Sequence, residues 1–429
     1  MKVFHMEDTV IERPRYLQRL KTFQDKDLIK VVTGVRRCGK STLLDLMKED
    51  LLSQDVPSDR ILSFKMESME YDGLDDYREL YRIVMDRARG LTHPYLFFDE
   101  LQDVPGWERA INSLRVDLDC DIYITGSNAH LLSSELSTLI SGRYIEVEMR
   151  PLVFEEYLRF RGFTRIAASP SLAQTSDGSI AALADLFADY RRFGGFPFLS
   201  LSEPDLETHR AYMRTLYETV IVRDILERAR RRGDRELQNR ALLERICAFL
   251  ADNVGNPNSV NSIAKAIKAE GLYAVNDTVD AYVAALTRAY LFYHVQRFDI
   301  KGKDLLKTNG KHFVVDTGIR SYLDGYRDAN LGHVLENIVF HQLSYQGYGV
   351  NVGKLRSGEV DFVAQRGAER VYIQVTENML DDDTMRRELA PLRAIPDAYP
   401  KMVVVGSGEY PADIDGIRIV RIEDYLLSD

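Results

Sequence analysis

The sequence predicts an α/β protein of several domains that begins with a largely parallel sheet. Short apolar runs in the first 160 residues are separated by amphipathic stretches with helical spacing, which is the pattern of repeated βαβ units. The runs are Leu28–Thr33, Ile61–Met66, Tyr95–Phe98, Asp121–Thr125 and Tyr144–Val147. A chain of 429 residues is too long for one ordinary hydrophobic core, so about two to four domains are expected.

Composition narrows the class of protein. Hydrophobic residues make up 45% and charged residues 28%, which is typical of globular chains and argues against extended disorder. The formal net charge is −10, so nucleic acid could bind only at a local basic patch. Cys38, Cys120 and Cys247 match no zinc or disulfide spacing, which favours a cytoplasmic location. No apolar run is long enough for a membrane span and the N-terminal residues lack a signal-peptide core, so we expect no membrane partner.

Changes in pattern divide the chain into four expected parts. These are residues 1–160, 161–240, 241–325 and 326–429. The second part opens with a small, polar segment, 164–179, which is interpreted as a surface loop or linker, and continues with a helical pattern. The last part opens with an amphipathic helix over Leu331–Tyr345. Strands are then expected at about 350–354, 359–365, 370–376 and 402–405.

A glycine-rich segment directly follows the first apolar run. Gly34 to Ser41 match the pattern G-x-x-x-x-G-K-[ST], and the helical stretch Thr42–Lys48 follows. The glycines allow backbone N–H groups to wrap a phosphate at a helix N-terminus, where the helix dipole favours negative charge. Lys40 is expected to reach the β- and γ-phosphates of ATP, and Ser41 to ligate Mg²⁺. The predicted nucleotide-binding residues are Gly34, Val35, Arg36, Arg37, Cys38, Gly39, Lys40, Ser41 and Thr42.

Polar residues at the ends of later strands complete a candidate catalytic site. Asp99 can deliver a carboxylate to the Mg²⁺ shell, and Glu100 can polarise the attacking water. Ser127 or Asn128 could sense the γ-phosphate, although an ordinary strand-to-helix turn is the alternative. Arg143 is a candidate charge-stabilising arginine, acting in an oligomer if it works on a neighbouring copy; a surface role is the alternative.

These motifs resemble the prokaryotic AAA-superfamily ATPases with a C-terminal domain of unknown function. The matching segments are Gly34–Thr42, Asp99-Glu100-Leu101-Gln102, Gly126-Ser127-Asn128, Gly142-Arg143, Gly194-Gly195-Phe196-Pro197, Val222-Arg223-Asp224-Ile225, Glu359-Val360-Asp361-Phe362 and Gln374-Val375-Thr376. The resemblance spans nearly the whole chain. It implies an ASCE-type P-loop NTPase core with the catalytic strand between the phosphate-loop strand and its neighbour. It also implies a helical and winged-helix-like middle and a small α/β, restriction-endonuclease-like C-terminal module.

The middle of the chain contains a candidate nucleic-acid-binding region. Ser259–Leu286 suggests a helix-turn-helix, with Ser259 capping the first helix and Gly271 ending it. Asp277 and Asp280 on the second helix would repel phosphates, so base reading by that helix is not expected. The basic groups are Lys301, Lys303, Lys307 and Lys311 around a predicted wing, and the run Arg228, Arg230, Arg231, Arg232 and Arg235. For the arginine run, a solvated helix end, non-specific duplex contact and a protein partner stay open.

The C-terminal strands predict a hairpin with a polar face. If Gly367 and Ala368 form a two-residue turn, Asp361 faces Gln374 and Glu359 faces Thr376. Val360, Phe362 and Ala364 then share an apolar face with Val371, Ile373 and Val375. The polar face resembles the PD-(D/E)xK nuclease site, with Glu336 on the preceding helix.

Two positions of that face depart from the nuclease pattern. Gln374 replaces an acidic ligand, and Thr376 stands where the lysine would be. A degenerate nuclease fold used for binding or scaffolding is therefore expected. An active nuclease and an unrelated α/β module are the alternatives.

The leading functional hypothesis is a Mg²⁺-dependent ATPase whose nucleotide state moves the later modules. ATP and Mg²⁺ are the expected cofactors, and DNA or a protein is the expected partner. A slow nucleotide-gated switch or signalling scaffold is the alternative, and an ATP-dependent nuclease is a third reading.

Overall fold

The computed structural model describes residues 10–74, 76–127, 142–231, 233, 237–327, 331–356 and 358–428, and these fall into two compact units. The first unit comprises Met1–Arg150 with the short stretch Arg288–Tyr290, and the second comprises Pro151–Thr287 with Leu291–Asp429. Each unit has its own sheet and its own hydrophobic core.

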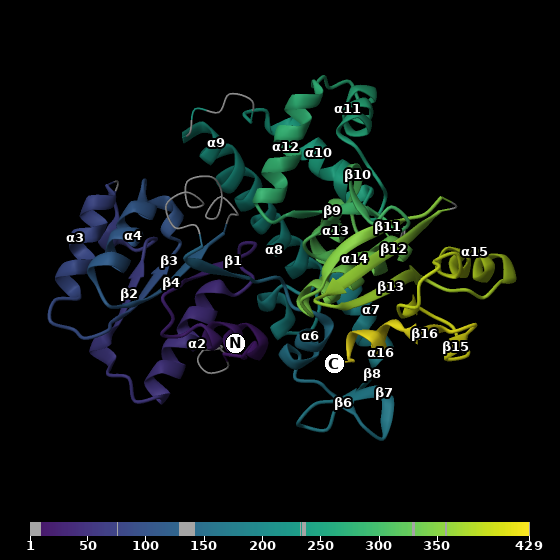
Figure 1. The fold of residues 1–429 in the computed structure, drawn as a ribbon, viewed down its shortest axis with the longest axis horizontal. Helices are drawn as coiled ribbons and strands as arrows, with labels where there is room; N and C mark the ends of the chain where they lie inside the picture. The colour runs from purple at the N-terminus through teal and green to yellow at the C-terminus, as the bar shows by residue number, and fades with distance from the viewer. Residues whose placement is uncertain are drawn as a thin grey trace. The chain divides into compact units, whose positions relative to one another are not determined.

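A parallel sheet forms the centre of the first unit (Figure 1). Its strands are β1 (Ile29–Thr33), β2 (Ile61–Lys65), β3 (Tyr95–Asp99), β4 (Asp121–Gly126) and β5 (Tyr144–Glu148). Within the described residues these strands lie in the order β2-β3-β4-β1-β5, and neighbours pair in parallel. The strands and the parallel pairing predicted from the apolar runs are confirmed.

The strand order corrects one expectation. β4 pairs with β1 on one side and with β3 on the other, so the strand that carries Asp99 does not lie directly beside the phosphate-loop strand. The resemblance implied that the catalytic strand lies between the phosphate-loop strand and its neighbour, and β4 takes that place, not the strand of Asp99 and Glu100. Because the strands are parallel, the carboxyl ends of β1, β4 and β3 still meet at one edge of the sheet.

Helices cover both faces of this sheet. The helical segments are α1 (Pro14–Thr22), α2 (Lys40–Ser53), α3 (Tyr77–Arg87), α4 (Trp107–Asp117) and the 3-10 turns Ser58–Arg60, Met69–Tyr71 and Leu101–Asp103. α3 and α4 lie side by side and share a buried cluster with the strands that includes Leu80, Phe98 and Ile111. On the other face α2 contacts β4. Strands covered on both faces are apolar along their length, which is why they appear as continuous runs.

After one helix, α6 (Phe154–Phe160), the second unit contains a small antiparallel sheet. Its strands are β6 (Thr164–Ile166), β7 (Ser169–Gln174) and β8 (Ile180–Ala182). The interpretation of 164–179 as a loop is therefore wrong. The strands are short and mix polar residues with alanines and single larger apolar residues, so no hydrophobic alternation marks them. Their turn is closed by side chains, since Ser179 N donates to Thr175 Oγ1 and Asp177 Oδ1, both at 3.1 Å.

One helix precedes this small sheet, and helices dominate the stretch that follows it, as predicted. They are α6 (Phe154–Phe160), α7 (Leu183–Phe193), the 3-10 segment Pro197–Leu201, α8 (Leu206–Glu218), the π-helical segment Thr219–Glu227, α9 (Arg228–Arg231), α10 (Arg240–Asp252), α11 (Val260–Ala269) and α12 (Asn276–Arg288). The Ser259 side chain accepts from Ser262 N and caps α11, and Gly271 follows its end with a φ of +84°. The cap and the stop predicted for this helix are confirmed.

A large mixed sheet holds the remaining strands of the second unit. They are β9 (Phe292–Asp299), β10 (Asp304–Val314), β11 (Gly349–Lys354), β12 (Glu359–Arg366), β13 (Glu369–Thr376), β14 (Lys401–Val405), β15 (Asp413–Ile414) and β16 (Ile417–Arg421). Among the described residues their order is β10-β9-β11-β12-β13-β14-β16-β15 (Figure 1). The predicted hairpin at Asp299 is present, but β9 also pairs in parallel with β11. The hairpin is thus an integral part of the large sheet. Four helices accompany it: α13 (Thr317–Leu323), α14 (Leu331–Tyr345), α15 (Asp382–Arg393) and α16 (Ile422–Leu426), in the described part of the chain.

The predicted register of the β12–β13 hairpin is confirmed from the Phe362–Ile373 pair to the turn, and one predicted face is corrected. Phe362 pairs with Ile373, and Arg366 with Glu369, as a turn at Gly367-Ala368 requires. Between its pairings with Asn351 and Gly353 of β11, β12 supplies an extra residue. This irregularity breaks the alternation, so Val360 joins the buried cluster of Val363 and not the face of Phe362.

The Gly194-to-Pro197 motif has a packing role. Gly195 N donates to Asp316 Oδ2 at 2.7 Å, and Gly318 N donates to Asp316 Oδ1 at 2.8 Å. A Cβ on Gly194 would lie 2.0 Å from Asp316 Oδ1, and one on Gly195 would lie 2.2 Å from the Leu152 carbonyl oxygen. Burial raises the pKa of Asp316 to about 6, against the opposing effect of these backbone donors. The glycines therefore let the chain approach a buried carboxylate.

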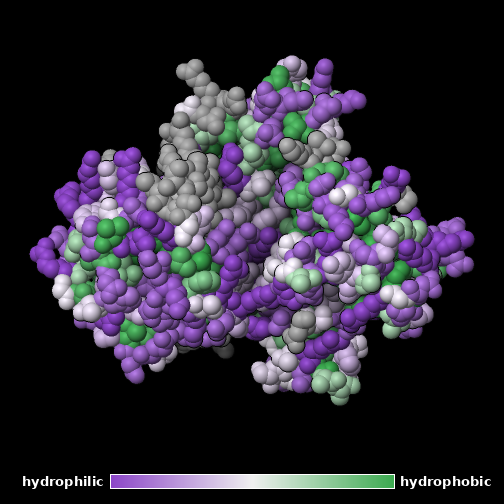
Figure 2. All heavy atoms as spheres, in the orientation of Figure 1, coloured by the Kyte–Doolittle hydropathy of each residue, from purple (hydrophilic) through white to green (hydrophobic). Residues whose placement is uncertain are grey.

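The face of the molecule drawn in Figure 2 is mainly hydrophilic. Figure 2 shows polar residues over most of the visible face, with hydrophobic residues in small separate groups. Among the described helices, none has the length and apolar character that crossing a membrane requires.

Candidate nucleotide-binding site

The loop between β1 and α2 is shaped by two glycines. Gly34 has a φ of +136°, and a Cβ there would lie 2.0 Å from the Met149 carbonyl oxygen. Gly39 has a φ of +101° and is the N-cap of α2. L-residues with a side chain rarely adopt such conformations. The loop therefore turns tightly against the chain after β5 and delivers its backbone to the N-terminus of α2, where an anion is favoured.

Lys40 is the first residue of α2, and its side chain contacts this loop. Its side chain is buried, and Nζ donates to the carbonyl oxygens of Gly34 and Val35 at 3.0 and 3.1 Å. Nζ also lies 4.0 Å from Glu100 Oε1. The ammonium is thus held between the loop backbone and the carboxylate expected to activate water.

Ser41 and Asp99 come together as predicted. Ser41 Oγ donates to Asp99 Oδ1 at 3.0 Å. Thr125, at the carboxyl end of β4, donates to the same Asp99 oxygen and accepts from Glu100 N at 3.0 Å. A hydroxyl and a carboxylate are hard oxygen ligands that suit Mg²⁺. Thr125 was not among the predicted site residues, although its place at the end of a strand beside β3 is a signal that could have identified it.

Glu100 is buried and held in a special conformation. Its φ of +55° lies in the left-handed region, which is uncommon for a residue with a side chain and often marks a functional site. Ser127 Oγ donates to Glu100 Oε2 at 3.2 Å, and Gln102 donates to the same oxygen. Burial pushes the pKa of Glu100 upward, but the charges of Lys40 and Arg36 and these hydrogen bonds outweigh it and hold the pKa below its usual value. The carboxylate is therefore ionised at neutral pH.

The other loop residues have mainly supporting positions. Cys38 is buried, its Sγ contacts the Met149 carbonyl oxygen at 3.6 Å, and burial raises the pKa of the thiol. Arg13, which precedes α1 and was not predicted, donates from Nη1 to the carbonyl oxygens of Cys38 and Arg150 at 3.1 and 2.7 Å. Arg37 is exposed with a φ of +64°, and Thr42 is exposed in the first turn of α2.

Two further predicted residues are not brought into this arrangement. Arg143 is exposed, and its carbonyl oxygen accepts from Ile29 N at the amino end of β1, whereas the loop lies at the carboxyl end. The geometry gives no support for a role of Arg143 in the site of its own chain, and action on a neighbouring copy stays a prediction. Asn128 lies outside the described residues.

A second group of charged side chains lies in the large sheet. Lys311 Nζ contacts Glu336 Oε2, Glu359 Oε1 and Asp361 Oδ1 at 2.9, 3.0 and 3.2 Å. These four residues are called the Lys311 cluster below. The assignment of Lys311 to a nucleic-acid surface is therefore wrong, because the residue is only 2% exposed. A buried lysine cannot be recognised from a sequence in which neighbouring lysines are exposed.

The neighbouring predicted residues have other partners. Gln374 Nε2 donates to Glu388 Oε2 at 2.9 Å, and Thr376 Oγ1 donates to the Asn378 carbonyl oxygen at 3.1 Å. Lys301 and Lys303 are exposed in the β9–β10 turn. Arg228 lies 3.9 Å from Asp224, and Arg230 is exposed. The side chains of Lys307 and Arg231, and the residues Arg232 and Arg235, lie outside the described part.

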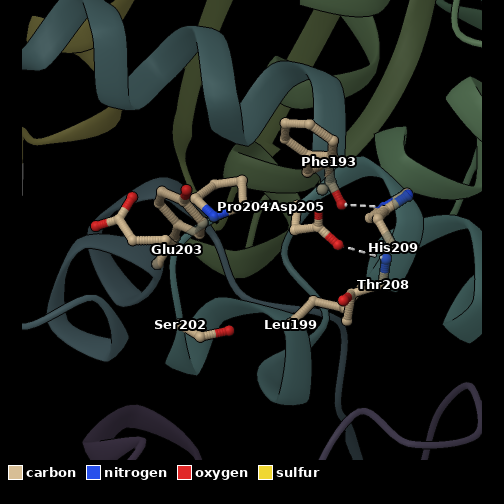
Figure 3. A pocket seen from close by; sticks show the side chains of 10 residues that line it. Phe193, Leu199, Ser202, Glu203, Pro204, Asp205, Thr208 and His209 are labelled. Carbon is tan, nitrogen blue, oxygen red and sulfur yellow. Dashed lines mark hydrogen bonds between the residues drawn. The ribbon is translucent and has the colours of Figure 1, made fainter.

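A small pocket lies near the Gly194 motif (Figure 3). His209 lines it, with Nε2 2.8 Å from the Phe193 carbonyl oxygen and Nδ1 2.6 Å from Tyr326 Oη. Asp205 caps α8 by accepting from Thr208 N at 2.7 Å. Burial lowers the pKa of His209 to about 4, so the ring is neutral. Asp205 and His209 form hydrogen bonds with backbone atoms, and His209 also contacts the Tyr326 side chain, which indicates a structural role for the wall of the pocket.

Comparison with known proteins finds family models that match two parts of the chain. Residues 26–158 match the family model of the AAA domain, and residues 184–330 match a domain of unknown function (DUF8612). An uncharacterized protein of Haemophilus influenzae is 36% identical over 424 residues, covering 99% of this chain and 100% of that protein. The uncharacterized protein MJ1544 of Methanocaldococcus jannaschii is 29% identical over 374 residues, covering 86% of this chain and 79% of that protein.

Solved structures are also similar. A Walker-type ATPase of Pyrococcus abyssi aligns with a TM-score of 0.46 at 13% identity, covering 73% of this chain and 96% of that one.

Proposed function

The chain belongs to the same family as the Haemophilus influenzae protein and carries an AAA domain, and on this premise we propose that it is a Mg²⁺-dependent ATPase. The observation that carries the proposal is the continuous hydrogen-bond path from Ser41 through Asp99 and Thr125 to Glu100. It joins the metal-binding groups to the base through neighbouring strands. A turn that only binds nucleotide would not require the contact between Thr125 and Glu100.

Each side chain then has a defined task. Backbone N–H groups of the loop and Lys40 bind the phosphates, and Ser41 with Asp99 would hold the metal ion. Mg²⁺, when bound, neutralises charge that develops on the phosphate oxygens. Glu100 orients the attacking water and accepts its proton, and Ser127 fixes the carboxylate in place.

The direct test is nucleotide turnover by the full chain with and without Mg²⁺. Glu100→Gln is expected to keep ATP binding and to slow hydrolysis at least about 100-fold, because the amide cannot accept the proton. Full turnover by this variant would contradict the assigned base. Slow turnover by the unmodified chain, unaffected by Glu100→Gln, would favour the nucleotide-gated switch.

We also propose that nucleotide state is coupled to a winged-helix-like and nuclease-like second unit that senses nucleic acid. The supporting observations are the capped α11, the following α12 and the exposed Lys301 and Lys303 in the β9–β10 turn. A panel of duplex DNA, single-stranded DNA and RNA tests this. Stimulation of turnover by one of them supports the proposal, and an unchanged rate with all three favours a protein partner.

A further inference from the structure

The Lys311 cluster contains charged side chains from separate elements of the large sheet and its helix. Lys311 comes from β10, Glu336 from α14, and Glu359 and Asp361 from β12. Lys311, Glu336 and Asp361 are 2%, 6% and 7% exposed, and Glu359 forms the more open side. Such a concentration of charge inside a protein is stable only when each charge is paired and hydrogen-bonded.

The ammonium is fully matched by its surroundings. A lysine ammonium has three N–H donors, and among the described residues three carboxylates lie within 3.2 Å of Lys311 Nζ. Burial alone would lower the pKa of Lys311, but the charges of Glu336, Asp361 and Glu359 outweigh it and raise the pKa. Lys311 therefore keeps its charge throughout the physiological range.

Two of the carboxylates, Asp361 and Glu336, are themselves fixed from behind. Asp361 Oδ2 accepts from Val375 N at 2.9 Å, and His333 Nδ1 lies 2.9 Å from Glu336 Oε1. A Cβ on Gly255 would lie 2.9 Å from His333 Nδ1 and 3.1 Å from Glu336 Oε2, so the backbone closes this side. The oxygens thus converge on the lysine nitrogen without freedom to spread around a larger ligand shell.

A divalent cation at this place would meet two obstacles. It would lie beside a permanent positive charge, and it would need six or more oxygen ligands where the lysine already takes one oxygen from each carboxylate. In the described part of the chain no group of three His, Cys, Asp or Glu residues has the arrangement that holds a metal ion.

We propose that Lys311 is a built-in counter-ion that occupies the place of a divalent cation and closes this carboxylate site to metals. The nuclease-like site is then inactive for a reason that the sequence did not reveal. The substitutions at Gln374 and Thr376 are secondary, and the site is blocked by a cation that belongs to the chain itself. The inference is independent of ATP binding by the first unit.

The test is a calorimetric titration of the nucleotide-free full chain with Mn²⁺. The unmodified chain is expected to show no binding that depends on Asp361. Lys311→Met keeps an unbranched side chain that is only one atom shorter and removes the charge, and it is expected to bind Mn²⁺ at least about tenfold more tightly. Lys301→Met, an exposed lysine on the same hairpin, is the matched control and should behave as the unmodified chain does. Adding Asp361→Asn to Lys311→Met should abolish the gain.

Each outcome decides the proposal. A rise in the unfolding temperature of Lys311→Met with Mn²⁺ supports it, even when that variant is poorly folded without metal. A folded Lys311→Met with no gain in Mn²⁺ binding overturns it. Because that variant can fail to fold, the unmodified chain provides a second test: Mn²⁺ binding, or cleavage of plasmid DNA, that is lost in Asp361→Asn also overturns the proposal.

Discussion

The loop of the first unit and the Lys311 cluster of the second both place a buried lysine near carboxylates, but in opposite ways. Lys40 donates to two loop carbonyl oxygens and lies 4.0 Å from one carboxylate, whereas Lys311 has three carboxylates within 3.2 Å. Neutral carbonyls can be exchanged for phosphate oxygens at little electrostatic cost. Three carboxylates that lie within 3.2 Å of the ammonium cannot. One lysine is therefore arranged for a ligand and the other for the fold.

The carboxylates beside the two lysines, Glu100 and Asp361, also differ in their pKa values. The pKa of Glu100 is held below its usual value, because nearby cations and hydrogen bonds outweigh its burial. The pKa of Asp361 is raised to about 7 by burial and by the charge of Glu336, in spite of Lys311. A base must be ionised at neutral pH, whereas a structural carboxylate can tolerate a shared proton.

The largest expected difference between the two lysines is the loss of stability when each is replaced. Lys311→Met is expected to lower the free energy of unfolding by about 3–5 kcal/mol, because it leaves buried carboxylates without their cation. Lys40→Met should lose less than half of that stability, since two of its partners are neutral carbonyl oxygens and its one carboxylate partner lies 4.0 Å away. Chemical denaturation of both variants measures this. Equal losses would contradict the distinction.

The pH dependence of stability should report Asp361. Its pKa rises from 3.8 in the unfolded chain to about 7 in the folded chain, so the folded state binds the proton more tightly. The contribution is fully present below pH 4 and is lost as the pH rises to 7, a change of about 4 kcal/mol at most. Denaturation of Asp361→Asn as a function of pH should lack this decline. An identical decline in the variant would show that another group titrates.

Thr125 should matter for turnover more than for binding. Thr125→Val keeps the shape but removes the hydroxyl that joins Asp99 to Glu100. Hydrogen bonds to charged groups contribute about 1.5–3 kcal/mol, so the catalytic rate should fall about tenfold or more. ATP affinity should change only slightly. Steady-state kinetics and nucleotide titration distinguish the two, and a loss of affinity with an unchanged rate would contradict this role.

The smallest expected effect concerns the exposed lysines. Replacing Lys301 and Lys303 by Ala should weaken any DNA binding several-fold. The slope of log affinity against log salt concentration should fall by the equivalent of about one to two phosphate contacts. Fluorescence anisotropy at several salt concentrations measures both quantities. Unchanged binding would move the contact to the arginines between 228 and 235.

The two sites also differ in how far the sequence could predict them. The loop is a local pattern, since Gly34 to Ser41 are consecutive and each has a chemical reason to be there. The register of the β12–β13 hairpin was equally local, because Gly367 and Ala368 fix which residues face each other.

The features that could not be predicted from the sequence depend on contacts between distant segments or have no hydrophobic periodicity. Thr125 and Arg13 act through strand order and through a contact across the fold, and Lys311 meets Glu336 and Asp361 only because β10, α14 and β12 come together. The irregularity that moves Val360 to another face arises from pairing with β11. The short strands at 164–182 carry no apolar alternation that a sequence could display.

Equilibrium titration of the full chain with ATP and Mg²⁺ tests the central claim most directly. The unmodified chain is predicted to bind, Lys40→Ala to lose that affinity, and Lys301→Ala to retain it. Absence of binding by the unmodified chain, or binding by Lys40→Ala that equals it, would contradict the assignment of the loop between β1 and α2 as the nucleotide site.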